Sequence, residues 1–507
     1  MADSASQCVF TFDPAAWEDE TGMSSPLSDE LLDDGVWQCS RDAASGEDRC
    51  LFHLPPERTD DRAVRDAFLA SIDESGDEPK RFIGARFGRL DLDYQIVACA
   101  DNHEIDLRHA RFEAPVTFRY AIVRQPIVFD GALFEQRPDF TEARFEGPVT
   151  LDKARFETPA RFLETEFADS FVAYRTRFRE GNFHNARFGE LAEFTDARFE
   201  RAQFRETDFE AIVRFNQTVF EEPSFSGSRF AGAVYFDEAT VPESVGLRKA
   251  RFDELVSFES LDLAAGTCYL DCKGARFAAG RLYLPEDGTA VYDLTDATIG
   301  EVELADGQPR ADLFDHYRFL NTTFERFDFG SYRSVFHECD WRIHDVVDVP
   351  HLETEESPSA GERETTYLKA KNGANEVGET KAAAEFFRRE MLARRAQYLP
   401  GDPWRWTANL LLDLTAGYGE RPSRVVGVSI GTILGFAGAF AVLRSTPPYG
   451  NPVGYFVLSL QSFVTLVLGG AEDAGGPWIR LLAQIEGFVG AFLIALFVFT
   501  LTRSIHR

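Results

Sequence analysis

The chain is poor in positive charge. Its 507 residues include 53 Lys and Arg against 84 Asp and Glu, which gives a formal net charge of −31, and only seven residues are Lys. Nucleic-acid binding depends on cations that neutralise phosphates, so this balance argues against a nucleic-acid partner. The hydrophobic content of 44% argues against a disordered chain. The sequence therefore predicts a folded protein of several domains with an acidic surface.

The acidity lies entirely before the last hundred residues. Residues 400–507 hold seven Arg, no Lys and six acidic residues, so residues 1–399 carry a net charge of −32. In very high salt, ions screen the repulsion between the acidic side chains, so this repulsion costs little stability. We therefore expect an extremely halophilic source, of haloarchaeal type. The alternative is a functional acidic face, such as one that mimics DNA.

Charge is nearly absent from two stretches near the C-terminus. Val425–Leu443 has no charged residue, and Leu481–Thr502 is interrupted only by Gln484 and Glu486. Each is long enough to span a bilayer. Arginines before the first stretch and after the second favour the cytoplasm at both ends, and the acidic start of the chain has no apolar signal core. We expect a cell-membrane protein with two spans, lipid contacts, and both termini in the cytoplasm.

A third uncharged stretch, Val453–Gly470, lies between these two. A third crossing would put the arginine-flanked ends on opposite sides, whereas a re-entrant helix leaves both in the cytoplasm. Non-helical backbone at membrane depth is tolerated where it lines a watery cavity. The sequence therefore favours a short re-entrant helix over a third span.

This order of segments resembles the two-helix pore family of potassium-type channels. The resemblance implies a homotetramer around one pore, and it assigns the selectivity filter to five consecutive residues: Thr465, Leu466, Val467, Leu468 and Gly469. Val467 replaces the first filter glycine and Leu468 the aromatic residue. A β-branched residue resists the positive φ that turns filter carbonyls toward one axis. The resemblance thus implies a channel for monovalent cations, K⁺ or Na⁺, without implying potassium selectivity.

The second span also resembles the inner helix of that family. Glu486 is expected to face the inner cavity, because a carboxylate inside a membrane is costly and by default functional. The alternative is a Glu hydrogen-bonded to the pore helix. Gly487 and Gly490 are expected to permit bending of the inner helix. Upstream, residues 404–414 read as an amphipathic helix at the membrane interface, and residues 367–398 as a helical connector or spacer.

Phenylalanine, with 47 residues, recurs at a fixed spacing in the middle of the chain. From residue 178 to 236 each Phe follows the last by five or six residues, and the tripeptide Ala-Arg-Phe ends at Phe87, Phe112, Phe145, Phe156, Phe188, Phe199, Phe252 and Phe277. No helix or flat strand has this period, whereas a solenoid does. A small residue two places before many of these Phe completes a pattern that resembles the pentapeptide-repeat family. The resemblance implies a right-handed quadrilateral β-helix over roughly residues 81–300, with a weaker continuation to Trp341.

Cysteine is scarce, with seven residues. An odd number in a cytoplasmic chain argues against a disulfide framework. Four ligand-type residues lie near the N-terminus, namely Cys8, Cys39, Cys50 and His53. A Cys3His set can hold a structural zinc ion, which would stabilise a small acidic segment. The alternative is a set of cysteines packed against the first coil of the solenoid.

We find no clustered nucleophile, His pair or phosphate loop in the sequence, and expect no enzyme. The predicted fold is multidomain, an all-β right-handed β-helix plus an α-helical two-span pore module. Its parts are an N-terminal cap with the candidate zinc site (1–80), the β-helix (81–350), an acidic linker with connector and interfacial helices (351–423), and the channel module (424–507). The predicted function is an ion channel whose cytoplasmic repeat domain serves regulation or binds an unidentified protein. The alternative is a non-conducting, membrane-anchored scaffold.

Overall fold

The chain folds into two compact units, residues 1–356 and residues 357–507. The computed structural model describes residues 6–73, 80–99, 103–351, 358–398, 401–443, 450–468 and 476–505. The first unit is mostly short β-strands and the second is entirely helical within these ranges. Each unit is described by itself.

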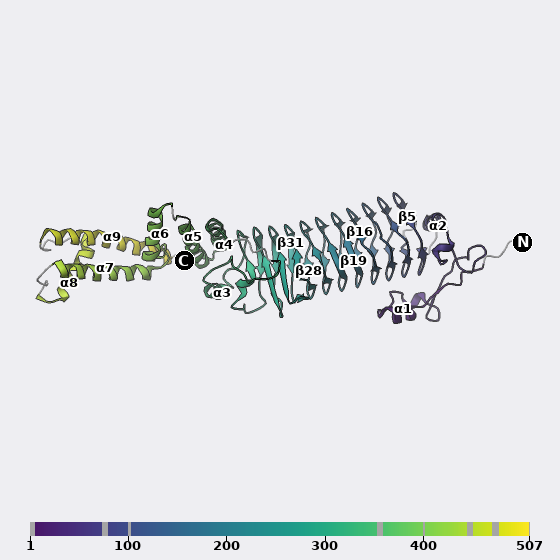
Figure 1. Cartoon of the computed structure of the whole chain (residues 1–507), viewed down its shortest axis with the longest axis horizontal. Helices are drawn as coiled ribbons and strands as arrows, with labels where there is room; N and C mark the ends of the chain where they lie inside the picture. The colour runs from purple at the N-terminus through teal and green to yellow at the C-terminus, as the bar shows by residue number, and fades with distance from the viewer. Residues whose placement is uncertain are drawn as a thin grey trace. The chain divides into compact units, whose positions relative to one another are not determined.

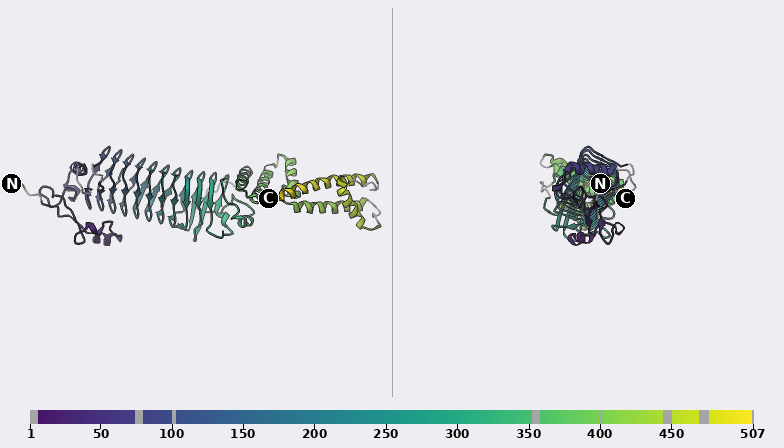
Figure 2. Two further views of the ribbon diagram at one scale, coloured as in Figure 1. Left: turned by 180° about the vertical axis from the view of Figure 1, so that it is seen from behind. Right: turned by 90° about the vertical axis from the view of Figure 1, so that its right-hand side faces the viewer.

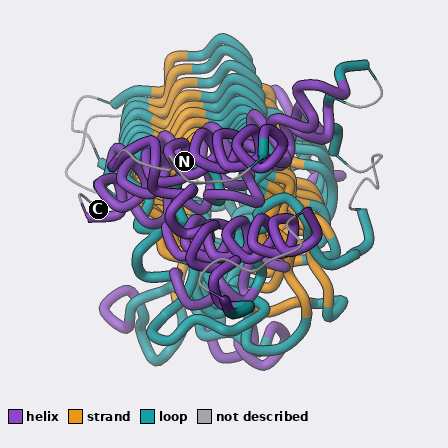
Figure 3. Tube along the Cα trace, turned by 90° about the vertical axis from the view of Figure 1, so that its left-hand side faces the viewer, coloured by secondary structure: helices purple, strands orange, loops and turns teal. Residues whose placement is uncertain are grey.

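Four ladders of parallel strands build the first unit into a four-sided solenoid, seen from the side in Figures 1 and 2. In Figure 3 the strands of successive coils lie one behind another. The first ladder contains β6 Ile96–Val97, β10 Ile122–Val123, β13 Arg144–Phe145, β17 Glu166–Phe167, β20 Arg187–Phe188, β23 Asp208–Phe209, β27 Arg229–Phe230 and β38 Thr323–Phe324. The second contains β3 Lys80–Arg81, β7 Ile105–Asp106, β11 Ile127–Val128, β14 Val149–Thr150, β18 Phe171–Val172, β21 Ala192–Glu193, β24 Val213–Arg214 and β28 Val234–Tyr235. Both share β31 Arg251–Ser257, β34 Arg276–Arg281 and β36 Thr298–Glu303.

The other two ladders form the remaining sides. The third contains β4 Arg86–Phe87, β8 Arg111–Phe112, β12 Leu133–Phe134, β15 Arg155–Phe156, β25 Val219–Phe220, β29 Thr240–Val241 and β32 Asp262–Leu263. The fourth contains β5 Leu90–Asp91, β9 Val116–Thr117, β16 Ala160–Arg161, β26 Pro223–Ser224, β30 Ser244–Gly246, β33 Thr267–Asp271, β35 Thr289–Asp293 and β37 Tyr317–Arg318. Strands β19 Arg177–Asn182 and β22 Arg198–Gln203 run through both.

The spacing of Phe follows from the sides of each coil. Phe188 of the first ladder pairs in register with Phe209 of the next coil, and the two rings stack at 4.8 Å. From Phe188 to Phe209 the chain takes one step of six residues, to Phe194, and three steps of five. The six-residue step lies at the corner between the first and second ladders. The chain forms a bend there instead of a turn. Each such coil therefore consists of four five-residue sides and one extra residue at a corner, which explains the mean Phe spacing near 5.3 residues.

The small residue before each Phe fills the interior and satisfies the backbone. Thr207 is fully buried, and its hydroxyl donates to the Phe183 carbonyl oxygen of the preceding coil at 2.8 Å. Thr218 makes the same bond to Phe194 at 2.7 Å. A buried hydroxyl without a partner would be costly, and these bonds therefore allow Thr to occupy the buried position that Ala occupies in other coils.

The N-terminal segment covers the first coil. It contains β1 Thr11–Phe12, which pairs antiparallel with β2 Trp37–Gln38, and the helices α1 Pro14–Thr21, η1 Asp29–Leu31, η2 Pro56–Arg58 and α2 Asp61–Asp73. Phe68 of α2 packs on Phe82 of the first coil at 4.7 Å between ring centroids. The amphipathic helix α2 thus closes the open end of the Phe core, as solenoid ends require.

A second cap closes the other end of the solenoid. The last strand of the solenoid is β38, which ends at Phe324; η3 Leu313–His316 lies before β37, and α3 Arg333–Glu338 follows β38. The weaker continuation suggested by the sequence is thus coiled as far as Phe324. Beyond it, aromatic packing closes the end, since Phe336 stacks on Phe314 at 3.9 Å and on Trp341 at 4.9 Å.

The second unit is a chain of six helices within the described residues. They are α4 Ala360–Glu376, α5 Thr380–Gln397, α6 Pro403–Ala416, α7 Pro422–Leu443, α8 Val453–Leu468 and α9 Pro477–Ile505. Glu390 of α5 is buried and binds Lys371 of α4 at 2.7 Å, and Arg394 of α5 binds Glu364 of α4 at 2.7 Å. These ion pairs fasten α4 and α5 into a helical hairpin.

Candidate functional site

Two helices of the second unit are long and apolar enough to cross a membrane, namely Pro422–Leu443 and Pro477–Thr502. Helix α8 is apolar too, but its 16 residues rise about 24 Å. The hydrocarbon core of a bilayer is about 30 Å thick. By length and composition, the unit has two candidate spans with a shorter apolar helix between them in sequence.

Helix α8 runs parallel to α9 and packs on both long helices. Near its start, Leu458 shares a buried cluster with Phe440, at the end of α7, and Ile479, at the start of α9. Further along, Phe463 packs against Leu493, well inside α9. The start of α8 therefore lies level with the start of α9, and its later part lies level with the middle of α9.

Gly490 marks the closest approach of α8 and α9. A Cβ atom built at this glycine would lie 2.1 Å from the Phe463 carbonyl oxygen, well inside contact distance. The sequence assigns Gly487 and Gly490 to bending, but α9 is continuous through both residues, and both are buried. Gly490 thus has a packing role, and bending stays a prediction.

Glu486 is fully buried at the interface between α8 and α9. Its Oε1 accepts a hydrogen bond from the Ser459 hydroxyl, which also lies 2.7 Å from the Ile433 carbonyl oxygen. Its Oε2 has no hydrogen-bond partner among the described residues. This is the position expected for a Glu bonded to the pore helix, and the inner-cavity role stays a prediction. Ser459 could not be singled out from the sequence, because its only signal is a hydroxyl in an apolar helix.

The residues assigned to the filter lie at the end of α8. The backbone of Thr465, Leu466, Val467 and Leu468 is helical, whereas the resemblance implies an extended strand from Thr465. Gly469 lies outside the described residues. No helix-breaking residue precedes it, since Val467 occupies the position of the family's first filter glycine, and the helix therefore continues.

Helix α6 has the exposed apolar face of an interfacial helix. Trp404 is 79% exposed, and Leu411 and Leu414 are 56% and 59% exposed. At its end, Gly417 and Tyr418 both adopt positive φ, and the turn leads directly into α7. Apolar groups that lie unburied on a helix next to two candidate spans suit a bilayer surface.

The four candidate zinc ligands come together in the N-terminal cap. One ligand atom from each of Cys8, Cys39, Cys50 and His53 lies within 4.8 Å of all the others, and all four residues are buried. The thiol sulfurs of Cys39 and Cys50 are 3.9 Å apart. His53 Nδ1 lies 3.1 Å from the Cys50 sulfur and 3.7 Å from the Cys8 sulfur. The structure thus places all four donors around one point.

A hydrogen bond within this cluster shifts the pKa values of Cys39 and Cys50 in opposite directions. The hydrogen bond from the Cys39 thiol lowers the pKa of the Cys50 thiol well below its usual range, although burial opposes this shift. The same bond and burial raise the pKa of Cys39. By contrast, Cys268 and Cys272 are buried in the solenoid core, and burial raises the pKa of Cys268 to about 12. Only the N-terminal cysteines form a ligand set of this kind within the described ranges.

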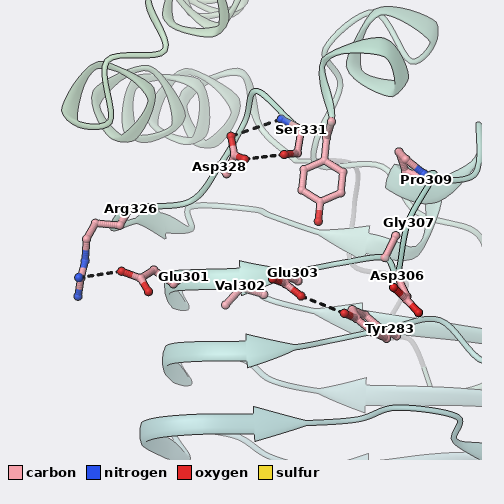
Figure 4. A pocket seen from close by; sticks show the side chains of 12 residues that line it. Tyr283, Glu301, Val302, Glu303, Asp306, Gly307, Pro309, Arg326, Asp328 and Ser331 are labelled. Atoms are coloured by element: carbon pink, nitrogen blue, oxygen red, sulfur yellow. Dashed lines mark hydrogen bonds and ion pairs between the residues drawn. The ribbon is translucent and has the colours of Figure 1, made fainter.

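A hollow of about 400 Å³ lies near the last coils of the solenoid (Figure 4). Two of its carboxylates have partners, because Glu301 pairs with Arg326 at 2.8 Å and Glu303 accepts a hydrogen bond from Tyr283 at 2.9 Å. The Ser331 hydroxyl donates to the Asp328 carboxylate at 2.5 Å, and both residues are exposed (Figure 4). We assign no chemistry to this hollow.

The four-sided solenoid agrees with a comparison against protein families. The model of pentapeptide repeats matches residues 129–171, 173–219 and 215–260, with nine copies. The solenoid is a pentapeptide-repeat domain. Its ladders continue beyond the matched stretches, from β3 at Lys80 to β38 at Phe324. No curated protein and no solved structure matches the chain.

Proposed function

We propose that α7, α8 and α9 form the pore module of a membrane ion channel that assembles as a homotetramer and passes monovalent cations. The observation that carries this proposal is the parallel packing of α8 on α9. Both helices start at the same level, and the later part of α8 lies beside the middle of α9. A pore helix and an inner helix are expected to be arranged in this way in a pore-loop module.

This arrangement supports a re-entrant α8 flanked by two crossings. Even numbers of crossings keep Arg421 and Arg424, before the first span, on the same side as Arg503, after the second. The proposed topology puts both termini in the cytoplasm. Four copies would surround one axis, with the end of α8 and the residues that follow it forming the constriction.

The pentapeptide-repeat domain then lies on the cytoplasmic side, where it would regulate the pore or bind a protein. Its acidic surface supports adaptation to molar salt. The core of stacked Phe rings is apolar, so its packing does not depend on the charge of that surface. A DNA-mimicking role would use the same acidity and is the alternative for this surface.

Ion flux from liposomes tests the proposal directly. Purified full-length protein, reconstituted in vesicles loaded with K⁺ or Na⁺, is expected to release cations that empty vesicles retain, and to migrate as a tetramer in detergent. Val467→Gly is expected to raise the K⁺ to Na⁺ permeability ratio, because glycine permits the carbonyl geometry of a potassium filter. The matched control is Val442→Gly, the same substitution at a residue of α7 that is 86% exposed.

One observation favours a non-conducting scaffold as the second candidate. The helical backbone of Thr465–Leu468 presents no row of carbonyls to an ion. A scaffold would insert in the bilayer and leave both cations inside the vesicles, and Val467→Gly would then behave like Val442→Gly. A monomer in detergent that conducts no ion would refute the channel.

A further inference from the structure

The cysteine and histidine cluster of the N-terminal cap has no part in the proposed channel. Backbone hydrogen bonds, and not side-chain contacts alone, bring its donors together. Cys39 N donates to the Phe10 carbonyl oxygen at 3.1 Å, and Cys8 N donates to the Arg41 carbonyl oxygen at 2.8 Å. The four donors are therefore set by the fold of the cap.

The spacing of the donors is that of a tetrahedral metal site. With Zn–S bonds of about 2.3 Å and Zn–N bonds of about 2.0–2.1 Å, the edges of the tetrahedron are about 3.8 Å between sulfurs and about 3.5 Å between sulfur and nitrogen. Three of the six edges are 3.9 Å for the Cys39–Cys50 sulfurs and 3.1 and 3.7 Å for the two sulfur–His53 Nδ1 distances, and all six lie within 4.8 Å. A disulfide between Cys39 and Cys50 would need about 2.05 Å, so these are two reduced thiols, close enough to bind one ion.

The histidine is held in the tautomer that a metal requires. Nε2 of His53 lies 3.0 Å from the Ile83 carbonyl oxygen, which can only accept a hydrogen bond. Nε2 therefore carries the proton, and Nδ1 presents its lone pair to the sulfurs. Phe10 stacks on the imidazole at 3.9 Å and fixes the plane of the ring. A carbonyl that accepts from the second ring nitrogen is the usual support of a metal-bound histidine.

We propose that Cys8, Cys39, Cys50 and His53 bind one zinc ion with structural function. Binding would place three thiolates and one neutral imidazole on Zn²⁺, release the thiol protons to solvent, and leave a net charge of −1 at the site. The Cys50 backbone N–H, 3.2 Å from the Cys8 sulfur, would stabilise that charge. All four positions are filled by buried protein ligands, so the site has no open position for a reacting water.

The zinc ion would fasten the N-terminal segment to the pentapeptide-repeat domain. Ile83, which orients His53, belongs to the first coil, and Phe82 beside it packs under α2. The segment also reaches the side of the solenoid, where Phe12 stacks on His109 at 4.1 Å and Ser25 Oγ lies 3.0 Å from His109 Nε2. A metal can supply folding free energy that a small core lacks, in addition to these contacts.

Metal analysis of the full-length protein tests this inference. Protein purified in detergent without chelators is expected to contain about one zinc per chain by inductively coupled plasma mass spectrometry. Exchange into Co²⁺ is expected to give thiolate charge-transfer bands and the strong visible absorption of a tetrahedral site. Iron at one per chain in place of zinc, a Cys39–Cys50 disulfide found by mass spectrometry, or the absence of both zinc and cobalt binding would each overturn the proposal.

Two variants distinguish the loss of the zinc site from a general loss of folding. Cys39→Ser is expected to reduce zinc content at least tenfold and to expose residues 6–54 to limited proteolysis. Cys99 is half-buried and lies outside the cluster. The variant Cys99→Ser is expected to keep full zinc content and the wild-type cleavage pattern. Equal zinc content in the two variants would refute the ligand assignment, and the result does not depend on whether the channel conducts.

Discussion

The substitution Gly490→Ala should separate α8 from α9. The added Cβ would lie 2.1 Å from the Phe463 carbonyl oxygen, and a normal contact requires roughly 1 Å more separation between the helices. The contact is with backbone, so no side chain can rotate away. Overpacking of this kind costs about 1–3 kcal/mol.

Gly431→Ala is the matched control in the same unit. Nothing lies within 4 Å of a Cβ at Gly431, and alanine is preferred over glycine within a helix by up to about 1 kcal/mol. We therefore expect Gly490→Ala to lower the midpoint of thermal unfolding by roughly 2–12 °C, and Gly431→Ala to leave it unchanged or raise it. Circular dichroism at 222 nm of the protein in detergent, together with size-exclusion chromatography, measures both.

Equal midpoints for the two variants would refute the close packing of α8 on α9, and with it the parallel arrangement on which the pore-loop proposal depends. A loss of the oligomer in Gly431→Ala alone, with an unchanged midpoint, would instead identify the glycine face of α7 as a contact between subunits.

Three further predictions concern the pentapeptide-repeat domain, each measured by equilibrium unfolding of the full-length protein. Thr207→Val removes the hydroxyl bonded to the Phe183 carbonyl oxygen and is expected to cost about 1–2 kcal/mol, whereas Thr207→Ser should cost less. Phe204→Ala removes a fully buried ring that stacks on Phe183 at 4.8 Å and is expected to cost about 3–5 kcal/mol; a loss below 1 kcal/mol would contradict the stacked core. Burial, with Arg108 and Lys153 nearby, lowers the pKa of His109 to about 3, so stability is lost as the pH falls below the unfolded value near 6.5. Between pH 7.5 and pH 5 the wild type should lose up to about 2 kcal/mol relative to His109→Gln, and parallel pH profiles would show that His109 does not contribute.

The repeat domain could be predicted from sequence because each coil repeats one physical requirement. Phe188, Phe209 and Phe230 stand one above another only if the coil length is constant, and 21 residues separate each from the next. The ends of the domain could not be predicted in this way. Phe324 belongs to the last strand while Phe336 belongs to a cap, and a single Phe does not reveal whether another coil follows.

In the cap and in the helical unit, the sequence predicts residue types and helices but not the contacts between them. Residue type and spacing suggested Cys50 and His53 as a pair, but the carbonyl of Ile83, which selects the histidine tautomer, carries no signal in the sequence. Likewise, an apolar stretch predicts a helix at α8 but not where it ends, because Val467 and its neighbours favour neither a strand nor a break. Ser459 becomes meaningful only when α9 places Glu486 against it.

The pairing of charges between coils contributes little to the stability of so acidic a domain, and the stacked Phe rings contribute most of it. Arg187 pairs with Glu210 of the next coil and Arg198 with Glu221 at 2.8 Å, so the arginine of Ala-Arg-Phe faces an acid one coil further along. Exposed pairs of this kind contribute about 0–1 kcal/mol each and weaken in salt. The Phe column has the opposite dependence, because salts that are excluded from the surface strengthen apolar burial. A domain whose stability rests on stacked rings can therefore hold a large excess of carboxylates, provided that salt screens their repulsion, and this is the condition that a halophilic source would supply.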